Sequence, residues 1–196
     1  MKTKLCLLIL LIVGLSVQLS ANPINGLLER IDKGASKKFV IEFKKGADDF
    51  FELDQKGTKV VVRGNNYVNI ATGINWYLKY YAGIQLSWNG MQAKLPQVLP
   101  PVPRKERHET SLSLRYDFNY CTYSYTMAFW DWERWEKEID WMALHGINLP
   151  LAAVGQECIW FNMLQKLGYS KDEINRFIAG PAFLAWWAMN NLEGWG

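Results

Sequence analysis

The segments that decide the fold of this 196-residue chain are Arg115-Tyr116-Asp117-Phe118-Asn119-Tyr120-Cys121-Thr122, Trp130-Asp131-Trp132-Glu133-Arg134-Trp135 and Gly155-Gln156-Glu157. Together with the residues between them, they predict a strand, an aromatic-rich loop, a helix, a second strand and a polar loop. Short strand–helix–strand connections imply a parallel sheet with right-handed crossovers. We therefore expect the first two units of a (β/α) barrel, a fold whose active sites lie where the strands end.

The central helix of this pattern has clear limits. Asp131 is a suitable N-cap, and His145-Gly146 provides a cation and a glycine at the other end. We expect one apolar face that packs as core and an opposite face with ion pairs four residues apart. The apolar face comprises Trp132, Trp135, Ile139 and Met142, and the pairs are Glu133–Lys137 and Arg134–Glu138.

Strands are predicted at 111–118 and at 147–154, the second as a run buried on both faces. Pro150 disturbs the second strand because proline lacks a ladder donor, so this strand either starts after Pro150 or bulges there. Further helices are expected at 156–167 and 171–179.

The first 21 residues look like a signal peptide. A short cationic start precedes an apolar run from Leu5 to Val17, and small residues precede Asn22. The alternative is an uncleaved membrane anchor, but the run is shorter than the roughly 20 residues of a bilayer span. Loss of two lysines with the signal reduces the formal charge from +3 to +1. The remaining basic residues form no stripe, which excludes nucleic acid as a partner.

Cysteine and glycosylation patterns bear on the compartment. Cys6 lies in the signal, whereas Cys121 and Cys158 follow predicted strands and are either joined or free thiols. No Asn-X-Ser/Thr acceptor occurs in the chain. We therefore expect a secreted or periplasmic protein, with a bacterial source favoured, and no membrane attachment after cleavage.

The mature chain divides into three predicted parts. Residues 22–95 form a small α+β domain with strands at 38–44, 50–54, 58–63 and 84–88 and a helix from Asn69. Residues 96–110 hold four prolines and read as an extended linker. Residues 111–196 begin the barrel. A barrel typically takes about 250 residues, so we expect this sequence to be incomplete.

Candidate binding residues follow the two barrel strands. These are Asn119, Tyr120 and Cys121 after the first strand and Gly155, Gln156 and Glu157 after the second. The ten tryptophans suit stacking on sugar rings, but they suit a packed core equally. Glycoside hydrolysis needs two carboxylates, and only Glu157 has a rim position. His108, in the linker, and His145, at a helix end, argue against a metal or His-based site.

The amino-acid sequence from Arg115 onward resembles that of the α-N-acetylglucosaminidase family of glycoside hydrolases. The similar segments include Trp130-Asp131-Trp132, Glu138-Ile139-Asp140-Trp141-Met142-Ala143-Leu144, Gly146-Ile147-Asn148-Leu149, Gly155-Gln156-Glu157, Gly180-Pro181-Ala182-Phe183-Leu184-Ala185-Trp186 and, more loosely, Val61-Val62-Arg63-Gly64-Asn65-Asn66.

The resemblance implies an exported enzyme that removes terminal α-linked N-acetylglucosamine with retention and without a metal or organic cofactor. It implies two catalytic glutamates on later barrel strands, which no position of this chain matches. It assigns Asn119, Cys121 and Trp195 to the substrate pocket, while Gln156 and Glu157 either contact the sugar or support the rim. The alternative is a non-catalytic carbohydrate-binding or docking fragment. The pattern leaves the oligomeric state open.

Overall fold

The N-terminal domain is built on a four-stranded sheet of strand order β1-β3-β2-β4. In the computed structural model, which describes residues 22–190, the strands are β1 (Phe39–Phe43), β2 (Asp49–Lys56), β3 (Lys59–Gly64) and β4 (Glu106–Thr110). β1 runs parallel to β3, and β2 runs antiparallel to both β3 and β4. The three strands predicted from β-branched and aromatic residues between 38 and 63 are confirmed.

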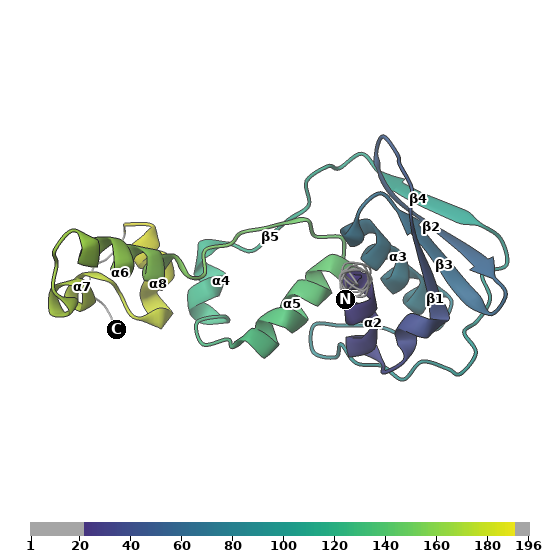
Figure 1. Ribbon diagram of the computed structural model, residues 1–196, viewed down its shortest axis with the longest axis horizontal. Coiled ribbons are helices and arrows are strands. Elements are labelled where there is room, and N and C mark those ends of the chain that lie inside the picture. The colour runs from purple at the N-terminus through teal and green to yellow at the C-terminus, as the bar shows by residue number, and fades with distance from the viewer. Residues whose placement is uncertain (1–21, 191–196) are drawn as a thin grey trace, which may run out of the picture.

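Two helices, α2 (Pro23–Ile31) and α3 (Tyr67–Tyr80), cover one face of this sheet (Figure 1). Each helix starts at an asparagine, because the Asn22 and Asn66 side chains accept hydrogen bonds from first-turn backbone N–H groups. Apolar side chains from both helices and from the inner sheet face form one core. Its fully buried members include Leu28, Leu53, Val60, Val62, Ile70, Ile74 and Leu78. A short 3-10 turn, η1 (Ala35–Lys38), leads from α2 into β1.

The segment 96–110 is part of the N-terminal domain, so its prediction as a linker is wrong. Leu99 and Val102 are buried in the core, and the Tyr77 hydroxyl donates to the carbonyl of Pro100 at 2.5 Å. Residues 106–110 form the edge strand β4, which contains His108. The prolines do keep 96–103 out of regular structure, as expected, but the apolar residues between them are drawn into the core. We infer that the domain boundary lies after Thr110.

The strand predicted at 84–88 does not form. Only an isolated bridge joins Ser87 to Gly90, and Leu86 is buried in the core. Gly83, with φ +65°, follows the end of α3 and adopts the left-handed conformation that favours glycine. Residues 84–90 are therefore a loop that is anchored by the apolar side chains of Leu86 and Ile84 rather than by a ladder.

The second domain begins with two short parallel strands, β5 (Tyr116–Asp117) and β6 (Leu149–Pro150). They are joined by α4 (Tyr120–Tyr125) and α5 (Trp132–Leu144). The elements that follow are α6 (Gln156–Lys166), α7 (Lys171–Phe177), the 3-10 turn η2 (Pro181–Phe183) and α8 (Leu184–Ala188). Figure 1 shows α5 between the N-terminal domain and the group of α6, α7 and α8.

The β5–β6 pair is much shorter than predicted, and β6 is exposed rather than buried on both faces. Pro150 is the last residue of β6 and pairs with Asp117; the next donor is the backbone N–H of Leu151, which bonds to the carbonyl of Asp117 at 3.0 Å. Since proline cannot donate, the ladder ends within one residue of it.

Helix α5 begins and ends as predicted, with the Asp131 side chain accepting from the backbone N–H of Arg134. Its buried face is nevertheless different from the prediction. Trp132 and Ile139 are 69% and 46% exposed, whereas Glu138 is 2% exposed and Asp140 is 8% exposed. A helical pattern assigns charged residues to solvent, but here the N-terminal domain supplies partners for both carboxylates.

The predicted signal peptide, residues 1–21, lies outside the described residues. Between residues 22 and 190, every helix is too short or too polar to cross a bilayer.

Candidate functional site

The carboxyl ends of β5 and β6 lie at one edge because the two strands are parallel. At the end of β5 the chain turns sharply. Phe118 has φ +73°, an uncommon value for a residue other than glycine, and the Asp117 side chain accepts from the Phe118 backbone N–H at 2.8 Å. This turn directs α4 away from the strand end and places Asn119 and Cys121 at the start of the helix.

Asn119 is exposed and caps α4. Its Oδ1 accepts from the backbone N–H of Thr122 at 3.1 Å, and the Thr122 hydroxyl oxygen accepts from the Asn119 backbone N–H at 3.2 Å. Within residues 22–190, no hydrogen bond uses the Asn119 side-chain NH₂ group. An amide donor is thus available to a ligand while the oxygen holds the helix. Its contact with a sugar stays a prediction.

The two cysteines of the described region are both exposed and both free. Cys121 lies in the first turn of α4, and Cys158 lies in α6, where Asn162 Nδ2 approaches its Sγ at 3.5 Å. The disulfide that the sequence left open does not form in this structure.

The loop after β6 places Gln156 and Glu157 at the start of α6. Gly155, the N-cap residue, has φ +87°, a conformation that favours glycine. The Glu157 carboxylate lies in the first helical turn, where the partial positive charge of the backbone N–H groups stabilises it.

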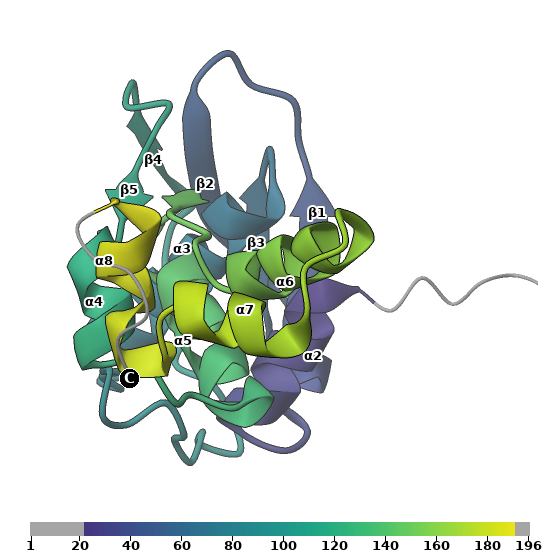
Figure 2. The ribbon, with the colours of Figure 1, turned by 90° about the vertical axis from the view of Figure 1, so that its left-hand side faces the viewer.

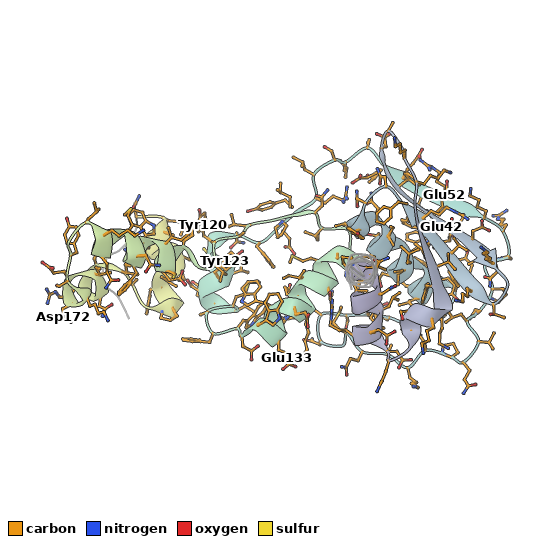
Figure 3. All side chains as sticks on the ribbon, viewed as in Figure 1. Glu42, Glu52, Tyr120, Tyr123, Glu133 and Asp172 are labelled. Atoms are coloured by element: carbon orange, nitrogen blue, oxygen red, sulfur yellow. The ribbon has the colours of Figure 1, made fainter. Side chains whose placement is uncertain are left out.

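A cavity of about 230 Å³ lies between the two loops, α5 and α8. Its wall contains Gln156 and Glu157 and is otherwise apolar, with five aromatic side chains among small and aliphatic ones. The aromatic members are Tyr120, Tyr123, Trp130, Trp135 and Trp187. Figure 3 shows Tyr120 and Tyr123 together on α4, and Figure 2 shows α8 beside that helix.

Tyr123 closes the inner side of the cavity. Its hydroxyl donates to the carbonyl of Leu151, which connects α4 to the end of β6. Burial raises the pKa of Tyr123, so the hydroxyl stays protonated and acts as a donor. Its ring packs edge-on against Phe118 and stacks on Trp135.

The structure gathers part of the predicted site. Gln156 and Glu157 line the cavity, whereas Asn119 and Cys121 lie on α4 next to Tyr120 but outside the cavity wall. Trp195 lies outside the described residues. Of the aromatic wall residues, Tyr120 is among the candidates predicted after the first strand, whereas Trp135 is predicted as part of the core stripe of α5. The aromatic-rich segment between 120 and 135 is the sequence signal for most of the others.

The acidic side chain in the cavity wall is Glu157. Across residues 22–190, no three His, Cys, Asp or Glu side chains gather as metal ligands would. The described residues thus provide aromatic faces, an amide and one carboxylate, which can bind a polar ring but do not supply two opposed carboxylates.

Comparisons with known proteins cover most of the chain. Residues 22–101 match the model of the α-N-acetylglucosaminidase N-terminal domain, and residues 115–196 match that of the α-N-acetylglucosaminidase TIM-barrel domain. Human α-N-acetylglucosaminidase is 44% identical over 164 residues, which are 84% of this chain and 22% of the human protein.

Solved structures of a family 89 glycoside hydrolase from Clostridium perfringens superpose with a TM-score of 0.84 at 40% identity, over 89% of this chain and 20% of theirs. One holds 2-acetamido-1,2-dideoxynojirimycin, and another, with two glutamates replaced by glutamine, holds its substrate GlcNAc-α-1,4-galactose. The chain therefore spans about a fifth of the length of the relatives it matches.

Proposed function

Since this chain belongs to the α-N-acetylglucosaminidase family of glycoside hydrolases, we propose that it forms the N-terminal domain and first two β/α units of an enzyme that removes terminal α-linked N-acetylglucosamine with retention. The observation that carries the proposal is the aromatic cavity, with Gln156 and Glu157 in its wall, at the carboxyl end of a parallel strand pair. Barrel enzymes keep their substrate sites at that end.

The cavity wall fits a hexopyranose. One face of such a ring carries C–H groups, which pack on the flat faces of tyrosine and tryptophan side chains. The hydroxyl and acetamido groups need donors and acceptors, which Gln156, Glu157 and the free NH₂ group of Asn119 can provide. Cys121, exposed beside the cavity, has no role as a nucleophile. Trp195 lies outside the described residues, and its part in sugar binding rests on the family resemblance alone.

The two catalytic glutamates lie elsewhere in the enzyme. Retaining hydrolysis needs two carboxyl groups about 5–5.5 Å apart, and Glu157 has no carboxylate partner in the cavity wall. The Clostridium perfringens protein that was captured with its substrate carries two Glu-to-Gln substitutions, which supports a glutamate pair as the catalytic group in the family. No metal or organic cofactor takes part.

We further propose that residues 1–21 direct export and are removed, so that the enzyme is secreted from the cell or acts in the periplasm. The apolar run from Leu5 to Val17 and the small residues before Asn22 support this assignment.

The test is an assay of the complete gene product that contains these residues. We expect it to release N-acetylglucosamine from an α-linked aryl glycoside and not from the β-linked isomer, with the α anomer appearing first by NMR. The 196-residue chain alone should release none. No turnover by the complete product, together with measurable sugar binding, would favour the non-catalytic alternative; the β anomer appearing first would contradict retention alone.

A further inference from the structure

Four side chains form a closed cluster between the N-terminal domain and the cavity wall: Trp88, Glu138, Arg134 and Trp130. We propose that Trp88 is a positioning residue for the substrate cavity, which acts through Glu138 and Arg134 on Trp130. The inference rests on the proposed function in one respect, namely that the cavity takes the sugar.

Glu138 is the fixed centre of the cluster. Its side chain is 3% exposed, and its Oε2 atom accepts from Trp88 Nε1 at 2.6 Å and from an Arg134 guanidinium nitrogen at 2.9 Å. A buried carboxylate that loses a partner is left poorly solvated, at substantial free-energy cost. Both donors are therefore held in place by the same oxygen.

Arg134 transmits this constraint to the cavity. Its guanidinium carbon lies 3.8 Å from the ring centroid of Trp130 and 4.9 Å from that of Trp88, so the cation is held against both indole rings. Trp130 in turn packs edge-on against Trp135, with ring centroids 5.0 Å apart. Trp130 and Trp135 are both wall residues of the cavity, whereas Trp88 is not.

The N-terminal domain gives Trp88 a rigid base. The loop that carries it is closed by the Ser87–Gly90 bridge and anchored by Leu86, which is 2% exposed in the domain core. Trp88 thus fixes the position of the cavity wall relative to the packed N-terminal sheet domain. A domain without wall residues of its own would in this way set the shape of the pocket.

The decisive variant is Trp88→Phe, which removes the Nε1 donor and keeps an aromatic ring. In the complete gene product we expect KM for the α-linked glycoside to rise about tenfold, equivalent to about 1.4 kcal/mol of binding, with kcat changed by less than about twofold. The matched control is Trp76→Phe, in the same domain but packed on Tyr80 and His108; its KM should stay at the wild-type value.

A second variant covers the case in which Trp88→Phe does not fold. Glu138→Gln removes the charge that holds Arg134 and keeps the size of the side chain, and it should raise KM in the same direction. An unchanged KM in a folded Trp88→Phe or Glu138→Gln protein would overturn the proposal, as would an equal rise in Trp76→Phe.

A readout that does not need activity separates this inference from the proposed function. In the 196-residue chain labelled with 5-fluorotryptophan, the ¹⁹F resonance of Trp130, assigned by its loss in Trp130→Phe, should shift in Glu138→Gln, which leaves the direct Trp88–Trp130 ring contact in place, and not in Trp76→Phe. An unmoved resonance would refute the positioning role. An inactive complete product with a shifted resonance would refute the proposed function and leave the positioning role in place.

Discussion

At the scale of single residues, Asn119 shows how one side chain serves the fold and remains available to a ligand. Its oxygen caps α4, and its NH₂ group points to no partner within residues 22–190. A loss of activity on substitution would therefore have two possible causes, helix capping or sugar contact, which a pair of variants can separate.

We expect Asn119→Ala in the complete enzyme to lower kcat/KM about tenfold or more, and to lower stability by about 1 kcal/mol through loss of the cap. Asn119→Ser should restore the cap but not the amide donor. Steady-state kinetics and urea unfolding of both variants distinguish helix capping from sugar contact. Recovery of kcat/KM in Asn119→Ser would mean that Asn119 acts by capping alone.

Glu52 of β2, labelled in Figure 3, is a carboxylate whose pKa lies well below its usual range. Its burial would raise the pKa, but hydrogen bonds from Lys44 and Arg107 and the ion pair with Lys105 outweigh burial and hold the pKa at about 2. A pKa depressed below the unfolded value of 4.5 stabilises the fold above that pH, and this stabilisation is lost as pH falls toward 2.

Glu52→Gln should therefore lower the free energy of unfolding at pH 7 by on the order of 2–3 kcal/mol. The difference from wild type should shrink between pH 4.5 and 2, as measured by urea unfolding at several pH values. Glu109→Gln, a change at an exposed partner of Arg107, is the control and should have little effect. A difference that stays constant with pH would contradict the assigned pKa.

At the scale of elements, α5 belongs to the barrel by sequence order but docks on the N-terminal domain. Asp140 receives two hydrogen bonds from Arg30 of α2, at 2.6 and 2.7 Å. Leu144 is buried in the N-terminal core. Just before β5, Arg115 donates to Asp49 of β2 at 2.8 Å, and this ion pair lowers the pKa of Asp49 although burial would raise it.

Asp140→Ala should destabilise the 196-residue chain by about 2 kcal/mol, less than the loss for a fully buried ion pair, because Arg30 is 40% exposed and can be hydrated. Glu133→Ala, which breaks the exposed pair with Lys137 on the same helix, should cost less than about 0.5 kcal/mol. Urea unfolding measures both. Equal losses would mean that the Arg30–Asp140 pair does not anchor the helix.

At the scale of the whole molecule, stability is unevenly distributed. The sheet, α2, α3 and the end of α5 share one core, whereas α6 has no buried residue and exposes Ile159, Trp160 and Met163. Figure 1 shows α6, α7 and α8 at the end of the molecule away from the sheet. Elements with few buried contacts open at low free-energy cost.

We expect amide hydrogen exchange of the 196-residue chain to show slow exchange in α3, β2, β3 and the second half of α5, and fast exchange in α6. Mass spectrometry of peptides from these elements can measure the difference. Equal protection in α3 and α6 would show instead that the two domains unfold as one unit.

The sequence by itself determined the local structure and the family. β-branched and aromatic residues placed β1, β2 and β3, and aspartate and glycine marked the two ends of α5 at Asp131 and Gly146. These features depend on neighbours within a few residues, which a pattern records directly. The parallel arrangement of the two barrel strands followed from strand–helix order.

Only the tertiary structure decided which faces are buried and which residues meet. The predicted linker packs into the core, and Trp132 is exposed. Glu138 and Asp140 are buried because they bind Trp88 and Arg30, which lie 50 and 110 residues away in sequence. No local pattern encodes such a pairing. A buried carboxylate is stable only with its distant partner in place, so the wall of the cavity could be read only from the folded chain.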